Sequence, residues 1–168
     1  MFSLPRDPLD PDPAHMFGEN ALGALYEYET GCCYLHPIEM KAGVGYWVYD
    51  PDNPIDVSYQ AADCDEGTAE VPCASAGWHM IGGQQRADVL VASCLVRRNS
   101  TGQTRSFEQA WLTDWWVSDP LFRYSCGTLG YLTTGVDAFF DGDAYLRASA
   151  GYWFYTREAD LTLIVPLP

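Results

Sequence analysis

Basic residues are scarce in this chain. It carries 9 Lys and Arg against 23 Asp and Glu, which gives a formal net charge of -14 over 168 residues. Nucleic acids and anionic membrane surfaces are bound by clustered cations, so we expect neither as a partner. The acidity suits solubility, or salty or extracellular surroundings.

Long apolar runs and a recognisable leader are also missing. No run approaches the ~18–20 apolar residues of a membrane helix, so we expect no membrane insertion. The first seven residues have neither the basic start nor the apolar stretch of a signal peptide. The sequence therefore predicts either a cytoplasmic protein or an excised part of a longer exported one.

Motifs for catalysis and metal binding are absent as well. None of the three histidines, His15, His36 and His79, lies in a His-Glu-x-x-His pattern, and there is no Gly-x-Ser-x-Gly nucleophile motif. No Cys-x2-Cys pair or Cys/His cluster has zinc-site spacing. We expect a protein that is not an enzyme. The alternative, an unrecognised hydrolase, needs a pocket with convergent carboxylates or a His-paired nucleophile.

Six cysteines are present, and an even number permits a disulfide framework. Cys64 and Cys73 flank a turn-rich loop and are the favoured pair. Such a bond would contribute roughly 2–3 kcal/mol on the chain-entropy model. The alternative is free buried thiols, because Cys packs well as a small apolar residue.

Aromatic residues, in contrast, are plentiful, and one aromatic phrase occurs twice. Residues 43–49 read Gly-Val-Gly-Tyr-Trp-Val-Tyr, and residues 149–155, at an offset of 106, read Ser-Ala-Gly-Tyr-Trp-Phe-Tyr. The same offset relates residues 55–59 to 161–165. Further matches occur at offsets of 96 (25–28 with 121–124), 97 (33–35 with 130–132) and 79 (1–2 with 80–81). The pattern indicates an internal duplication whose second copy carries insertions in loops.

The local patterns predict a mainly β fold. Strands are expected around 24–28, 33–35, 45–49, 55–59, 77–81, 89–91, 95–96, 121–124, 130–132 and 161–165, with a surface loop at 61–70. Ser106 and Gln109 fit a capping box, which predicts one short helix near 106–113. A short helical turn is expected near 13–16, because Asp12 and Pro13 suit its start.

We expect one domain in which two homologous repeats, 1–72 and 73–168, share one core with sandwich or barrel-like packing. Each repeat alone is small for a stable core. Residues repeated at matched positions suit packing, so Tyr46, Trp47, Tyr152, Trp153 and Trp78 are interpreted as the structural core of the repeat.

These residues resemble a β repeat of bacterial secreted and cell-surface proteins. Its pattern runs Gly-Trp-Asn-Leu-Ile-Gly/Ser, then Leu-Tyr-x-Tyr, then Gly-x-Gly-Tyr-Trp-Val. The matching stretches are 77–82, with His79 in place of Asn, 25–28 and 121–124, and 43–48 and 150–154. The resemblance implies export and surface display. It carries over no catalytic residues.

Two sets of residues are candidates for ligand binding. Trp115 and Trp116 are adjacent, so on a strand one would fill the core while the other could stack a sugar or anchor a protein. Asp137, Asp141 and Asp143 cluster around a glycine and are weak candidates for calcium, as are Asp50, Asp52 and Asp56. Solvated acidic turns are the simpler interpretation, and no cofactor is expected.

The sequence thus favours a non-catalytic β module of an exported or surface protein, acting in binding or as a structural spacer. Its partners would be a protein or a glycan. The alternatives are a carbohydrate-binding module and a stand-alone cytoplasmic protein, such as a mobile-gene product.

Overall fold

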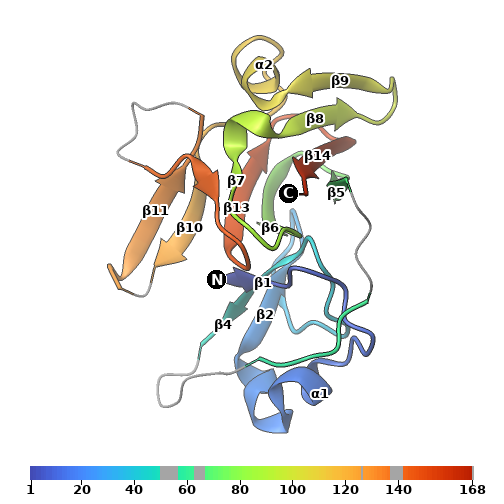
Figure 1. Cartoon of the computed structure of the whole chain (residues 1–168), viewed down its shortest axis with the longest axis vertical. Coiled ribbons are helices and arrows are strands. Elements are labelled where there is room, and N and C mark those ends of the chain that lie inside the picture. The colour runs from blue at the N-terminus through green and yellow to red at the C-terminus, as the bar shows by residue number, and fades with distance from the viewer. Residues whose placement is uncertain (50–56, 63–66, 126, 137–141, 168) are drawn as a thin grey trace.

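The computed structural model describes residues 1–49, 57–62, 67–125, 127–136 and 142–167, and its described part is mainly β (Figure 1). This confirms the fold class expected from the sequence. In Figure 1 the described residues up to position 62, called the first half below, form the lower body, and residues 67–167, the second half, form the upper, with β1 (Phe2–Ser3) where they meet. No helix among the described residues is long and apolar enough to cross a membrane.

The first half is built on one antiparallel sheet. Its strand order is β1-β4-β2-β3, with β1 (Phe2–Ser3), β2 (Leu25–Tyr28), β3 (Tyr34–Leu35) and β4 (Gly45–Val48). Helix α1 (Pro13–Phe17) and the 3-10 helix η1 (Glu19–Ala24) connect β1 to β2. The Asp12 carboxylate accepts a bond from the Ala14 N–H at 2.8 Å, which confirms the expected cap.

Two four-stranded sheets and a two-stranded ribbon lie beyond the first half. The first sheet has the order β11-β10-β13-β6, with β6 (Gly77–Gly82), β10 (Leu121–Ser125), β11 (Gly130–Thr134) and β13 (Gly151–Thr156). The second has the order β5-β14-β8-β9, with β5 (Thr68–Cys73), β8 (Leu95–Arg98), β9 (Gln103–Ser106) and β14 (Leu161–Pro166). The ribbon pairs β12 (Tyr145–Leu146) with β7 (Val89–Leu90), which leads into η2 (Val91–Ser93).

The capped helix forms where the sequence places it. Helix α2 (Phe107–Leu112) follows β9, and the Ser106 hydroxyl accepts from the Gln109 N–H at 3.1 Å. The Gln109 side chain accepts from the Ser106 N–H in return. Phe107 and Ala110 are fully buried, so the helix covers the core with the face that carries these two residues.

Strand pairs recur in the two halves in the same register. The residues that face each other in the first sheet correspond, at the offsets found in the sequence, to residues that face each other in the β11-β10-β13-β6 sheet. The matched pairs are Phe2–Tyr46 with Ile81–Tyr152, Tyr26–Trp47 with Phe122–Trp153, and Tyr28–Tyr34 with Tyr124–Tyr131.

The halves meet through reciprocal backbone contacts. The Ser3 N–H donates to the Ser149 carbonyl at 3.0 Å, and the Gly82 N–H donates to the Gly43 carbonyl at 2.8 Å. In the alignment of the repeats Ser3 corresponds to Gly82 and Gly43 corresponds to Ser149. Each bond therefore joins the same two repeat positions with the halves exchanged, as in contacts across a two-fold axis. A Cβ on Gly82 would overlap that of Ser3, so only one of these two positions has room for a side chain.

Buried apolar residues form two clusters. The smaller lies in the first half and contains Leu4, Met16, Leu25, Met40 and Tyr46. The larger lies in the second half and is built from the inner faces of both sheets and from helix α2, including Val96, Phe107, Leu121, Tyr152, Phe154 and Leu163. Whether the halves share one core stays a prediction.

Three local expectations need correction. Every sheet in the described part of the chain is open, so a barrel is not formed there. Residues 68–70 belong to β5 and not to a surface loop, because every second residue of β5 is buried against the core. Residues 57–59 are not in a strand, although residues 163–165, which match them at the offset of 106, lie in β14. Positions 50–56 and 63–66 lie outside the described residues.

Candidate functional site: an aromatic groove between the halves

The adjacent tryptophans lie on a loop and not on a strand. Trp115 has a left-handed backbone (φ 57°) and is 58% exposed, whereas Trp116 is 2% exposed. One therefore faces solvent and one the core, as expected, but the backbone conformation and not strand alternation separates them. The Arg157 guanidinium lies 4.5 Å from the centre of the Trp115 ring and donates to the Ser118 hydroxyl.

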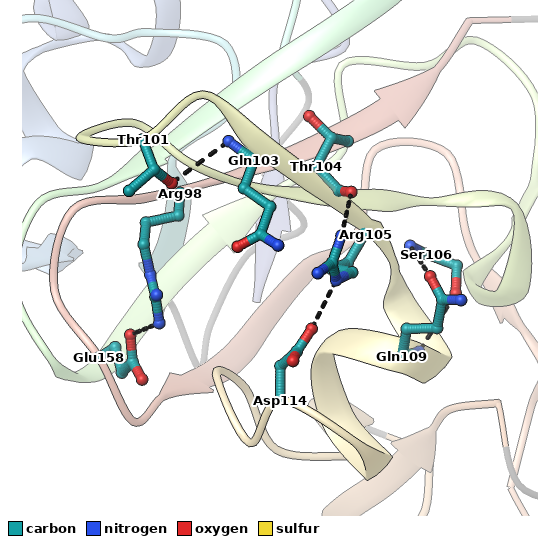
Figure 2. A network of polar contacts seen from close by, with 9 residues as sticks. All are labelled: Arg98, Thr101, Gln103, Thr104, Arg105, Ser106, Gln109, Asp114 and Glu158. Carbon is teal, nitrogen blue, oxygen red and sulfur yellow. Dashed lines mark hydrogen bonds and ion pairs between the residues drawn. The ribbon is translucent and has the colours of Figure 1, made fainter.

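Trp116 is unsuited to ligand binding because the protein itself covers it. The guanidinium carbons of Arg98 and Arg105 lie 4.5 and 5.9 Å from the centre of its ring. Figure 2 shows each arginine held by a carboxylate, Arg98 by Glu158 and Arg105 by Asp114, the latter at 2.7 Å. This network fastens the β8–β9 hairpin and the end of α2 over the ring, so Trp116 has a packing role.

The tyrosines of the repeated Gly-Tyr-Trp phrase are core residues. Tyr46 and Tyr152 are fully buried, and burial raises the pKa of both phenols. The Tyr46 hydroxyl accepts from the Lys41 N–H at 2.8 Å, and the Tyr152 hydroxyl accepts from the Arg147 N–H at 2.7 Å. The two bonds occupy matched positions, so the same tyrosine holds the same turn in each half.

The tryptophans of the phrase are not core residues, which corrects the interpretation above. Trp47 and Trp153 are half-buried and Trp78 is 42% exposed, and none belongs to either buried cluster. Successive residues of a strand point to opposite faces, so a buried Tyr46 or Tyr152 turns its neighbouring tryptophan to the other face of the sheet.

Rings from the two halves meet on this other face. Tyr28 of the first half contacts Trp153 of the second, with ring centres 4.9 Å apart, and Trp47 contacts Tyr124 at 5.0 Å. These contacts are again matched. The two tryptophans therefore join the halves, and Trp153 also lines the groove beside this contact.

A groove opens on one side of this contact. Its lining consists of five aromatic residues, and its volume is about 430 Å³. The lining residues are Tyr28, Trp78, Phe122, Tyr131 and Trp153. Trp78 and Tyr131 are 42% and 52% exposed, so the groove is open to solvent.

The matched position in the first half is filled. Tyr26 corresponds to Phe122, and the ring of His36 lies 4.6 Å from that of Tyr26. His36 is held there by a bond of 2.9 Å between its Nδ1 and the Leu25 carbonyl. In the second half Thr133 corresponds to His36 and carries no ring, which leaves the Phe122 ring open to the groove.

The acidic candidates are only partly described. Asp137 and Asp141 lie outside the described residues, as do Asp50, Asp52 and Asp56. The Asp143 carboxylate accepts from the Arg147 guanidinium, which also pairs with Asp88. Among the described residues no group of three His, Cys, Asp or Glu side chains is arranged to hold a metal ion.

The cysteines pair differently from the expectation. Cys73 is a free and fully buried thiol on the inner face of β5, so the Cys64–Cys73 bond is wrong; Cys64 itself lies outside the described residues. Burial raises the pKa of the Cys73 and Cys94 thiols to about 12. The sulfur atoms of the neighbouring residues Cys32 and Cys33 lie at disulfide distance in the exposed β2–β3 turn.

His79 has a structural environment. Its side chain is 8% exposed, and its ring nitrogens contact the Thr30 hydroxyl at 2.9 Å and the Ser75 carbonyl at 2.9 Å. Burial lowers the pKa of His79. The imidazole therefore ties the end of β2 to β6.

The sequence analysis assigned none of the five lining residues to ligand binding, because it interpreted Trp78 and Trp153 as core. The other three appeared in it only as parts of repeated stretches, Tyr28 and Phe122 in the Leu-Tyr-x-Tyr pattern and Tyr131 in residues 130–132. Comparison of the chain with protein-family models, with curated proteins and with solved structures finds no match.

Proposed function

We propose that this chain is a non-catalytic binding module and that the aromatic groove is its ligand site. The observation that carries the proposal is the exposure of large rings, above all Trp78 and Tyr131, around a hollow of about 430 Å³. Leaving apolar surface in water costs about 25 cal/mol per Å², and a ligand that covers the rings recovers this free energy. The five lining side chains carry no carboxylate, imidazole or thiol, which favours binding over catalysis.

We further infer that the module is a duplicated β repeat of the kind found in bacterial surface proteins. The equal strand registers and the reciprocal Ser3–Ser149 and Gly82–Gly43 bonds support this, because duplication of one pairing unit accounts for both. Export is part of the proposal. The Cys32–Cys33 pair at disulfide distance supports it, since a disulfide there would persist in an oxidising compartment.

A second candidate function is carbohydrate binding at Trp115. Its ring is 58% exposed and is fixed by Arg157, and an exposed fixed ring can stack on a sugar. This site is separate from the groove, because Trp115 is not among the groove's lining residues.

The test is a binding screen read by tryptophan fluorescence and thermal melting, with soluble glycans and small apolar and aromatic probes. A ligand at 100 times its dissociation constant adds about 2.7 kcal/mol, which a melt resolves. We expect hits that are lost in Trp78→Ala and retained in Trp115→Ala. Glycan hits with the opposite dependence would instead favour the Trp115 site. If no compound binds, or if the compounds that bind have the same affinity for Trp78→Ala and Trp115→Ala as for the parent protein, the groove is not a ligand site.

A further inference from the structure

The rings of the groove stand at steep angles to one another. Trp78 and Trp153 have centres 6.3 Å apart and planes at 85°, and Tyr28 meets Trp153 at 4.9 Å and 75°. Phe122 meets Trp78 at 6.0 Å and 62°. Rings in this arrangement surround a hollow from several sides, whereas a sugar platform presents ring faces in one plane.

A hollow walled by rings on several sides favours a cation. The face of an aromatic ring carries negative potential and attracts a cation within about 6 Å of its centre, and quaternary ammonium groups are recognised by such aromatic walls. A sugar also requires hydrogen-bonding side chains, and the only polar atoms that the lining side chains offer are tyrosine hydroxyls and indole N–H groups.

Ring–cation pairs form elsewhere in this chain, over both exposed and buried rings. Arginines lie over Trp115, Trp116 and Tyr145 at 4.5 to 5.9 Å. Within the described part of the chain, no lysine or arginine lies over Trp78 or Trp153. The groove rings are therefore open to a cation from outside the protein.

The charge of the protein points the same way. The formal net charge of -14 creates a field around the protein that attracts cations. A carboxylate on the ligand would be repelled by this field. A ligand with an ammonium group and no acid group, such as choline, is favoured over glycine betaine.

We propose that the groove binds a small soluble quaternary ammonium compound of the choline type, held by the five lining rings of Tyr28, Trp78, Phe122, Tyr131 and Trp153. The inference rests on the proposed function, because it names the ligand class of the same groove. The apolar methyl groups would cover the rings, and the positive charge would contribute the ring–cation attraction.

The test is isothermal titration at constant ionic strength with choline, glycine betaine and 3,3-dimethylbutan-1-ol, which has the shape of choline without its charge. Choline is expected to bind about tenfold more tightly than the neutral alcohol, the size of a partly desolvated cation–ring attraction. Betaine should also bind more weakly than choline. Binding should be lost in Trp78→Ala and in Tyr131→Ala and kept in Trp115→Ala. Tyr131→Ala removes an exposed ring on the edge strand β11.

Other outcomes separate the two proposals. If the neutral alcohol binds as tightly as choline and loses affinity in Trp78→Ala, the groove is a ligand site but the cation inference is overturned. If phosphatidylcholine vesicles or a trimethyl-lysine peptide bind and free choline does not, the proposed small soluble ligand is wrong. If neither these compounds nor the screening panel binds, both proposals fail.

Discussion

Gly45 and Gly151 lie where the two halves cross, and neither has room for a side chain. A Cβ on Gly45 would lie 2.6 Å from the Ile81 carbonyl oxygen, and one on Gly151 would lie 2.7 Å from that of Phe2. Ordinary contacts begin near 3.4 Å. Because the opposing atoms are backbone, the strands themselves would have to move apart.

We expect Gly45→Ala and Gly151→Ala each to lower the free energy of unfolding by about 2–3 kcal/mol, the upper part of the range for overpacking. In a chain of this size that is a fall in melting temperature of about 5–10 °C. The two glycines occupy matched positions, so the two losses should be similar. Both act on one crossing, so the double variant should lose less than the sum.

Thermal and urea unfolding followed by circular dichroism would measure these losses. Gly23→Ala is the matched control, because a Cβ there meets nothing within 4 Å, and its stability should be unchanged or slightly raised. If both crossing variants melt within about 1 °C of the parent protein, the halves are not packed as closely as the reasoning requires.

Three further outcomes are expected. Tyr46→Phe and Tyr152→Phe each remove the acceptor of a partly buried backbone N–H, so each should cost about 1 kcal/mol in urea unfolding, and a difference above about 1 kcal/mol would contradict their equivalence. Burial raises the pKa of the Cys73 and Cys94 thiols to about 12, so both should react with a thiol reagent only after unfolding, and fast labelling at either of these two positions in the native protein, located by peptide mapping, would refute their burial. Burial holds the pKa of His79 below its ordinary 6.5, so the unfolded chain binds its proton more readily and stability should fall as pH drops below that value. Urea midpoints at about pH 7.5 and pH 5 should show this fall, and His79→Gln should reduce it.

Local patterns in the sequence determine much of the fold. Gly-Tyr-Trp and Leu-Tyr-x-Tyr stretches predict strands because aromatic residues suit a pleated surface, and Ser106 with Gln109 predicts helix α2 because both side chains satisfy N–H groups next to them in the chain. The offsets between the repeats also relate the strand registers of the two halves. These features depend on neighbours that are near in sequence.

The tertiary structure alone decides which face of each strand is buried. Tyr46 and Trp47 alternate on one strand, and the sequence offers an aromatic residue for either face, so hydrophobicity does not say which enters the core. The answer depends on distant partners: Tyr46 packs with Leu25 and Met40, whereas Trp47 meets Tyr124 of the other half. The groove exists only because those faces meet.

Long-range contacts also determine whether the candidate binding residue Trp116 and the candidate disulfide residue Cys73 have the predicted roles. Trp116 is a packing residue because Arg98 and Arg105 cover it, and Cys73 stays a thiol because β5 turns its side chain into the core. The short spacing between Cys64 and Cys73 favoured a disulfide between them. Spacing limits only how near two residues can come to each other and does not say which way their side chains point. Which side of the sheet a residue faces is fixed by pairing with strands far away in sequence, and that pairing is what only the folded protein supplies.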